Sequence, residues 1–379
     1  MKLLMLGDLS YDFEHVADDI KAIGDFIRDS KASVILNLEG ALTDGSSKEI
    51  RKRGKHLRQT GAVEATLREL NTIGVTLANN HMMDYGSKGL SDTLVALEEA
   101  KIKYAGAGMM LKDALKPMII NDGDKKIAVF NFGWDAEETV YAGRKSPGCA
   151  PRKNDVVLKT VVDYSHNNPL HSIIVTLHWG FEYNLYPQPY DIDLAHRLCN
   201  VKNVKAVIGH HSHCPQPMEI YNGKPIYYSL GNFYFGSRRI KYTRRIFDFT
   251  PKDMSDYGLG VMIDTQSWES APIVHFYDKD AERTVLLDSD ILPVKMPDMD
   301  FRSEAYRKLA VKHAMKGNPI LGTDEKANDK IIFKYNSARN LMRYSGGAVA
   351  FMKKNPLGKA AINLGRKMAG LPVDRGIDK

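Results

Sequence analysis

The feature of this sequence that most constrains its fold is the alternation of short apolar runs with amphipathic segments over about the first 230 residues. The apolar runs lie at 2–6, 33–38, 74–78, 127–132, 172–177 and 204–208. Between them, apolar residues recur at helical spacing near 11–29, 61–71, 87–101, 151–165 and 190–200. Because strands and helices alternate in this way in layered proteins, the sequence predicts a layered α/β domain.

The remainder of the chain has a different pattern. Residues typical of hairpin strands lie at 217–221, 225–230, 258–265 and 271–288. We expect these segments to add antiparallel strands to the same domain. Residues 301–379 hold 17 Lys and Arg against 6 Asp and Glu, a net charge of +11, whereas residues 1–300 hold 36 against 40, a net charge of −4. We therefore predict one domain at 1–300 and a basic, mainly helical extension at 301–379.

Composition excludes several classes of protein. The 379 residues are 43% hydrophobic and 26% charged, as in an ordinary globular protein. No apolar run approaches the ~18–20 residues of a membrane-spanning helix. The three cysteines form no CxxC pair, which argues against a disulfide scaffold and a cysteine zinc finger and fits a reducing cytoplasm. Since the first apolar run reaches Gly7-Asp8 too early for a secretory signal, we expect a cytoplasmic protein.

Five of the apolar runs end in residue types that bind metal ions. They lead into Gly7-Asp8, Asn37-Leu38-Glu39, Asn79-Asn80-His81 with Asp84 just beyond, His178 to Glu182, and Gly209 to His213. The loops that leave the carboxyl ends of strands share one edge of an α/β sheet, so we expect these side chains to converge. Asp, Glu, Asn and His supply oxygen and nitrogen ligands without thiolate. Two cations about 3.5–4 Å apart, bridged by a carboxylate, suit hydrolysis of a phosphate or acyl bond.

Taken in order, these motifs and the segment Tyr228 to Phe233 resemble the calcineurin-like metallophosphoesterase superfamily. More closely, they resemble its branch named for the poly-gamma-glutamate capsule synthesis protein CapA. The resemblance covers about residues 1–265 and implies a four-layer αββα sandwich. It also implies a role in synthesis of a capsule or other extracellular polymer.

The resemblance implies a role for each residue of the motifs. Two divalent ions (Mn, Zn or Fe) are expected, one held by Asp8 and His213 and bridged by Glu39 to the other. The second ion would be completed by Asn80, His178 and His211, and His81 would be the acid or charge stabiliser. Two positions depart from the superfamily: Ser10 stands where a His is usual, and Glu39 stands where the bridging Asp is usual. The ion at Asp8 and His213 is therefore expected to be weakly held, and a mononuclear site stays open.

Three further residues near these motifs have alternative interpretations. Asp84 is a candidate catalytic residue that orients His81, or a turn residue. Glu182 is a candidate general base or substrate contact, or part of a surface salt bridge. His210 is interpreted as orienting its neighbours rather than as a ligand.

Two basic segments also have alternative interpretations. The run from Lys48 to His56 is either a solvated loop or a grip for an anionic substrate. The tail from about residue 335 mixes Lys and Arg with apolar residues. It predicts either basic amphipathic helices on an anionic membrane surface or helices docked on the body. Nucleic acid is not expected as a partner, because stacking aromatics are sparse and no recognition motif is found.

Two classes of function follow. The first is a metal-dependent hydrolase that cleaves a phosphoester or amide-type bond in an anionic or polymer-derived substrate. The second is a non-catalytic component of a membrane-associated capsule assembly complex that retains the metal fold. The complete set of ligand residues favours the enzyme. In both cases we expect a cytoplasmic location, with peripheral association at the inner face of the membrane through the tail.

Overall fold

The computed structural model describes residues 1–11, 17–52, 55–135, 138–235, 253–288, 292 and 294–344. Three features discussed above lie partly outside these residues. They are the start of the first helical pattern, Arg53 and Gly54 of the basic run, and the part of the extension beyond residue 344.

Most of the strands form two sheets. The eight-stranded sheet has the order β18 (Arg283–Leu287), β17 (Ser270–Asp278), β16 (Tyr257–Asp264), β1 (Lys2–Ser10), β2 (Ser33–Leu38), β5 (Thr72–Thr76) and β6 (Lys103–Ala105), and β15 (Asn232–Phe235) also pairs with β1. The six-stranded sheet has the order β13 (Met218–Tyr221), β14 (Lys224–Tyr227), β12 (Val204–His210), β11 (Ser172–His178), β9 (Lys125–Gly133) and β8 (Met118–Asp122). Two short pairs are β3 (Ala41–Leu42) with β4 (Arg58–Gln59), and β7 (Ala107–Gly108) with β10 (Gly148–Cys149).

Two of the helices begin at residues that favour a helix start. They are α1 (Ala17–Ser30), α2 (Ala62–Glu69), α3 (Gly86–Glu99), α4 (Leu111–Ala114), α5 (Asn154–Asn167), α6 (Pro189–Cys199), α7 (Glu304–Lys312) and α8 (Glu325–Tyr344), with a 3-10 turn η3 (Asp253–Asp256). Proline occupies the first position of α6, where its missing N–H costs nothing. Ser303 caps α7, because its side chain accepts a hydrogen bond from the Tyr306 backbone N–H.

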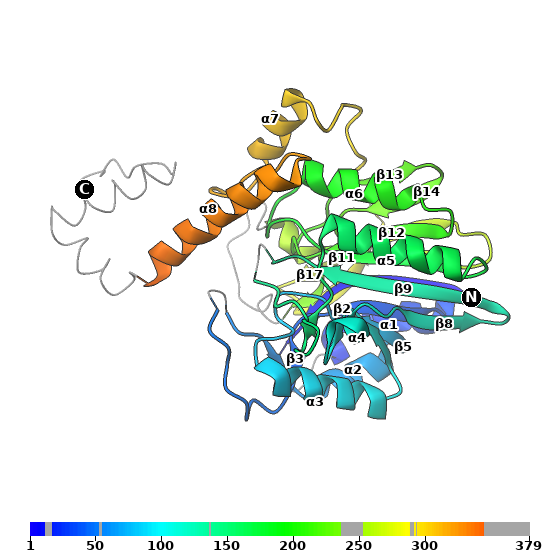
Figure 1. Ribbon diagram of the computed structural model, residues 1–379. Helices are drawn as coiled ribbons and strands as arrows, with labels where there is room; N and C mark the ends of the chain where they lie inside the picture. Colours follow the sequence, from blue (N-terminus) through cyan, green and yellow to red (C-terminus); the bar gives the residue numbers. More distant parts are fainter. Residues whose placement is uncertain are drawn as a thin grey trace.

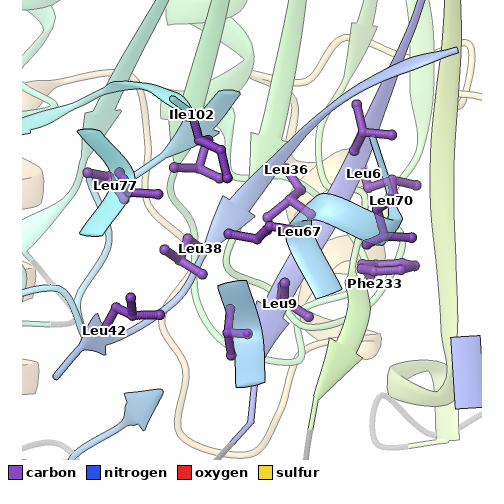
Figure 2. Packing of buried hydrophobic residues seen from close by; sticks show 14 of the residues in the cluster. Leu6, Leu9, Leu36, Leu38, Leu42, Leu67, Leu70, Leu77, Ile102 and Phe233 are labelled. Carbon is purple, nitrogen blue, oxygen red and sulfur yellow. The ribbon is translucent and has the colours of Figure 1, made fainter. Parts of the chain in front are cut away.

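The apolar runs are continuous because their strands are buried on both faces. In β1, Leu4 and Leu6 point to the outer face of the eight-stranded sheet, where they meet α1, α2 and α3. Figure 2 shows part of this cluster, with Leu6 and Leu36 of the strands near Leu67 of α2. The alternate residues Leu3 and Met5 belong to a different cluster, which fills the space between the two sheets.

The cluster between the sheets joins strands of both. It includes Ile35 of β2 on one side and Val129, Ile174 and Ile208 of β9, β11 and β12 on the other. A third cluster packs the outer face of the six-stranded sheet against α5 and α6. The order helix, sheet, sheet, helix confirms the predicted four-layer αββα sandwich (Figure 1).

The central strands of each sheet run in the same direction, which brings their carboxyl ends together. β1, β2 and β5 run parallel to one another, as do β9, β11 and β12. Asp8 pairs in register with Asn37, and His178 pairs with His210. Each sheet therefore brings the polar residues that follow its apolar runs to one edge.

The later strands extend these two sheets, as predicted. β13 and β14 form an antiparallel hairpin, as predicted, but β14 joins β12 in parallel rather than antiparallel. β17 pairs antiparallel with both β16 and β18. β16 in turn pairs antiparallel with β1. β15 instead runs parallel to β1 and brings Asn232 opposite Asp8.

The described part of the extension is helical and contacts the body. Tyr306 and Ala310 of α7 belong to the cluster that packs on α5 and α6. α8 then leads away from the body on the side opposite the N-terminus, where β1 begins (Figure 1). Among the described residues, no helix combines the length and the hydrophobicity that crossing a bilayer requires.

Candidate metal centre

Asp8 is held at the end of β1 by a close approach of two backbones. Its N–H donates to the Gly231 carbonyl at 3.0 Å. A Cβ on Gly7 would lie 2.1 Å from the same Gly231 oxygen, so a side chain at position 7 would force the strands apart. The Asp8 carboxylate is fully buried and accepts hydrogen bonds from Asn37 Nδ2 at 2.8 Å and the His211 N–H at 3.2 Å.

Burial raises the pKa of Asp8, but its neighbours more than offset that effect. His210 Nδ1 lies 3.2 Å from Asp8 Oδ1, and His213 Nδ1 lies 3.8 Å from Oδ2. Together with the Asn37 amide, these groups hold the pKa of Asp8 below its usual value. His210 thus lies behind Asp8 and contacts it directly.

Glu39 has the opposite environment. It follows β2, and its N–H is fixed by the Leu9 carbonyl at 2.9 Å. The side chain is fully buried, and neither carboxylate oxygen has a hydrogen-bond partner among the described residues. Burial and the nearby negative charges of Asp8 and Glu182 raise the pKa of Glu39 well above its usual value. A buried carboxylate without donors is costly, and a cation beside it would remove that cost.

Two of the predicted ligands, both histidines, adopt unusual backbone conformations. His211 has a φ of 95° and His213 a φ of 57°, a region that non-glycine residues rarely occupy. Backbone strain of this kind persists only where the surrounding structure enforces it, and it is concentrated at active sites and ligand-binding sites. A Cβ on Gly209, just before them, would lie 1.8 Å from the Tyr228 carbonyl oxygen, so this motif glycine is also required by a close approach.

The imidazole rings of His178 and His211 are uncharged, which is the form that binds a metal ion. Burial lowers the pKa of His178 well below its usual value and that of His211 to about 4, so both rings are neutral near pH 7. Neither ring nitrogen of His211 has a hydrogen-bond partner in the part of the chain that is described. Asn232 Nδ2 donates to the Ser255 carbonyl at 3.4 Å, so its Oδ1 accepts from His213 Nδ1 at 2.8 Å. That bond leaves His213 Nε2 as the free acceptor.

Six predicted ligands converge in two groups that share Glu39. One contains Glu39, His178 and His211, and the other contains Asp8, Glu39 and His213, with ligand atoms within 4.8 Å of one another in each group. Glu39 Oε1 lies 4.0 Å from both His178 Nε2 and His213 Nε2. An ion at about 2.0–2.2 Å from two ligand atoms keeps them no more than about 4.4 Å apart, so these spacings fit a bound cation. Asn80 Oδ1 joins the first group, 2.9 Å from His178 Nε2.

The predicted catalytic residues lie beside the first group. His81 Nε2 lies 3.9 Å from Glu39 Oε1, and His81 Nδ1 lies 2.8 Å from Asp84 Oδ2. Asp84 is fully buried and also accepts from the Leu57 N–H at 2.7 Å. Glu182 is half-buried, and its negative charge acts on Glu39, His81 and His211. Nδ1 of His81 is therefore engaged away from the centre, and Nε2 faces it.

Lys52 is a residue of this centre that the sequence did not identify individually. Its side chain is only 4% exposed and forms an ion pair with Asp84. Lys52 Nζ also lies 3.1 Å from the Asn80 carbonyl and 2.9 Å from His81 Nδ1. Nothing distinguishes it from the other basic residues of the run, of which Lys48 and Lys55 are exposed.

The four-layer fold and this set of Asp, Glu, Asn and His resemble those of the calcineurin-like metallophosphoesterases. Residues 4–237 match the family model described as "Bacterial capsule synthesis protein PGA_cap". Because the match covers more than half of the chain, the protein belongs to this family.

The chain is similar to curated proteins over part of their length. It is 31% identical over 230 residues to a "Capsule biosynthesis protein CapA" of Bacillus anthracis, covering 59% of this chain and 54% of the relative. It is 33% identical over 207 residues to a "Probable polyglutamine synthesis accessory protein" of Mycobacterium tuberculosis, covering 52% and 54%. The chain thus spans about half the length of these relatives.

Similarity to solved structures is more distant. A 5'-nucleotidase precursor from Thermus thermophilus aligns with 75% of this chain and 55% of its own, at a TM-score of 0.46 and 13% identity. The calcineurin-like phosphoesterase YfkN from Bacillus subtilis aligns with 76% of this chain and 88% of its own, at a TM-score of 0.41 and 13% identity.

Proposed function

We propose that this protein is a metal-dependent hydrolase that cleaves a phosphoester or amide-type bond during synthesis of a capsule or other extracellular polymer. The observation that carries the proposal is Glu39, a buried carboxylate without hydrogen-bond donors among the described residues, shared by two groups of potential ligands. The substrate is an anionic or polymer-derived molecule, in keeping with the family.

In this proposal each side chain has one task. The divalent ions, of which we expect two, would be held by Asp8, Glu39, Asn80, His178, His211 and His213. Such ions act as Lewis acids that stabilise the negative charge that develops during hydrolysis. His81 Nε2 faces the centre, and the protonated ring donates its Nε2 proton to the leaving group while Nδ1–H donates to Asp84. Glu182 acts as the general base or contacts the substrate.

The test combines metal content with turnover. Protein loaded with Mn²⁺ is assayed with 4-nitrophenyl phosphate, bis(4-nitrophenyl) phosphate and a γ-glutamyl 4-nitroanilide. His81→Asn should lower kcat by about 10²–10⁴-fold on the substrate that is cleaved, with metal content unchanged. His166→Asn is the matched control, because His166 is exposed at the end of α5. A metal-loaded protein that cleaves none of the three substrate classes would contradict the proposal.

The second candidate is a non-catalytic component of a membrane-associated capsule assembly complex. The printed name of the Mycobacterium tuberculosis relatives, an "accessory protein", favours it. The two candidates differ in what His81→Asn does to cells that produce the polymer. Normal polymer production with this variant would favour the binding role, and loss of polymer with a metal-loaded, folded variant would favour the enzyme.

A cytoplasmic location with peripheral binding to anionic lipid is also a proposal. Lys326, Lys330 and Lys334 recur every four residues along α8, and Phe333 beside them is 73% exposed. Each basic residue near anionic lipid contributes about 1 kcal/mol of attraction, which salt screens. The chain should sediment with phosphatidylserine vesicles at low salt and be released at high salt. Replacing the three lysines by glutamine should weaken this binding, and equal sedimentation of both proteins would contradict the proposal.

A further inference from the structure

The segment that carries Glu182 is a tight loop between β11 and α6. It begins directly after His178, and Gly180 and Tyr183 have positive φ values of 78° and 59°. The chain therefore reverses direction on both sides of Glu182. Because Glu182 is not in a strand or a helix, its position depends on the groups that hold this loop.

One side of the loop is held by the body of the protein. The Tyr183 N–H donates to the Ser212 carbonyl at 2.7 Å, beside the ligands His211 and His213. Gln216 Nε2 donates to the Asn184 carbonyl at 2.8 Å. These bonds attach the loop to the segment after β12, which also belongs to the metal centre.

The other side of the loop is held by the C-terminal extension. Asn318 lies between α7 and α8, and its Nδ2 donates to the Glu182 carbonyl at 3.0 Å and to Asn184 Oδ1 at 3.1 Å. The Leu185 N–H donates to the His313 carbonyl at 3.5 Å. The carbonyl of Glu182 is thus fixed by a residue that lies outside the segment 4–237 matched by the family model.

The orientation of Asn318 is itself fixed by α8. The Tyr335 hydroxyl donates to Asn318 Oδ1 at 3.2 Å, so both protons of Nδ2 point to the Glu182 loop. The Tyr335 ring also packs edge-on against Phe181, with centroids 5.2 Å apart. α8 therefore contacts the loop both directly and through Asn318.

The same contact continues beyond Glu182. The Leu321 N–H donates to Gln188 Oε1 at 2.8 Å, and the Tyr306 hydroxyl donates to the Pro187 carbonyl at 2.9 Å. Leu321 is fully buried in a cluster with Trp134, Phe181 and Tyr190. The extension thus covers the loop from Phe181 to its end at α6.

We propose that the C-terminal extension is part of the catalytic centre, in which Asn318 is a positioning residue that holds Glu182 toward Glu39 and His211. The inference rests on the proposed function only in assigning Glu182 a role in hydrolysis. The extension thereby couples its own docking to turnover. Loss of the Asn318 bonds leaves the metal ligands in place and allows the Glu182 loop to move.

The first test measures how firmly the loop is held and requires no turnover. Hydrogen exchange of the amides at 181–185 should be about tenfold faster in Asn318→Ala, which removes two hydrogen bonds to the loop. It should be about threefold faster in Tyr335→Phe, which removes only the hydrogen bond that orients Asn318. Asn121→Ala is the matched control, because Asn121 is exposed in β8 beside Asp122, which binds the N-terminal amino group at the opposite end of the strands. Unchanged exchange in Asn318→Ala would overturn the proposal.

The second test asks whether Asn318 acts through Glu182. With Mn²⁺ and bis(4-nitrophenyl) phosphate, Asn318→Ala should lower kcat about tenfold at unchanged KM and metal content. In the Glu182→Gln background the same change should have no further effect. A loss that multiplies across the two sites would overturn the positioning role. Absence of turnover in the wild type would contradict the proposed function, whereas the exchange experiment would still decide whether Asn318 holds the loop.

Discussion

The two ligand groups share Glu39 but differ in how their other polar atoms are satisfied. In the first group, both ring nitrogens of His211 lack a hydrogen-bond partner among the described residues, while His178 Nε2 and Asn80 Oδ1 are hydrogen-bonded to each other at 2.9 Å. In the second group, Asp8 already accepts hydrogen bonds and lies against two imidazoles. Because unsatisfied buried groups raise the free energy of the metal-free fold, the first group gains more from an ion. We therefore expect the first group to bind its ion more tightly.

The residue types of the second group lead to the same expectation. Ser10 lies where the superfamily usually carries a histidine ligand, and its side chain is 3% exposed. The pKa of Asp8 is held low by neighbours, whereas that of Glu39 is raised. The second group is thus better satisfied without an ion and lacks the histidine that the superfamily usually carries, so we expect it to be the weaker of the two sites.

The largest effect is expected from Glu39, because both groups depend on it. Glu39→Gln should remove nearly all bound metal at both sites, as measured by mass spectrometry of dialysed protein. The same change should raise the melting temperature in the presence of EDTA, since it removes a buried charge that lacks hydrogen-bond donors in the described chain. A gain of 1 kcal/mol corresponds to about 2–4 °C for domains of about 150–250 residues.

Exposed Glu99, at the end of α3, provides the matched control, and Glu99→Gln should change neither quantity. If Glu39→Gln kept one tightly bound ion, the two groups would be independent and the comparison between them would be wrong. If it lowered the melting temperature in EDTA, Glu39 would have a structural partner outside the described residues.

The next effect separates the two groups. His178→Ala should lower the affinity for the tighter ion by more than about 100-fold. Removing a residue that only orients a ligand already costs up to about 100-fold in metal affinity, and His178 is itself a predicted ligand. His213→Ala should leave one tightly bound ion and remove the weaker one. Titration of metal-free protein with Mn²⁺ by calorimetry gives both affinities. Equal loss in the two variants would mean that the groups do not differ as their hydrogen bonds indicate.

These residues could be predicted because they follow apolar runs directly. β2 spans the predicted residues, and β1 and β11 extend one to four residues past their predicted ends. Since these strands are buried on both faces, each is a continuous apolar run that can be recognised in the local sequence. The positions of Asp8, Glu39 and His178 at their ends could therefore be predicted. The hydrogen-bond pattern that makes the two groups unequal depends on Asn37, whose role is set by tertiary packing.

Other parts could not be predicted from local sequence. β3, β4, β7 and β10 have two residues each, too few to show a period. Lys52 turns inward because it forms an ion pair with buried Asp84. The sequence of the basic run alone does not distinguish a buried lysine from a solvated one. Asn318 belongs to no motif and acquires its contact only when the extension docks. Each of these depends on residues distant in the sequence.

A smaller effect is expected from Lys52, which contacts Asn80 of the first group and, among the described residues, no ligand that belongs to the second group alone. Lys52→Met removes the donor to the Asn80 carbonyl and leaves Asp84 without its ion pair, which should destabilise the fold by about 3–5 kcal/mol. The double variant Lys52→Met with Asp84→Asn removes both charges and should recover most of that stability. In the double variant the tighter ion should weaken about tenfold, as for other residues that orient ligands, and the weaker ion should not change. Equal weakening of both ions would show that Lys52 does not distinguish the groups.

The smallest effect is a gain at the second group. Ser10 and Asp8 are alternate residues of β1, so their side chains point to the same face of the strand. Ser10→His supplies the missing nitrogen ligand and should raise the affinity for the weaker ion by about tenfold, the low end of the effect of one residue that orients a ligand. The affinity for the tighter ion should not change. Calorimetric titration of the variant, compared with Ser10→Ala, measures this difference. Ser10→Ala should bind as the wild type does, because the serine hydroxyl is not among the expected ligands. If Ser10→His tightened neither ion, the weakness of the second group would come from its satisfied hydrogen bonds rather than from a missing ligand.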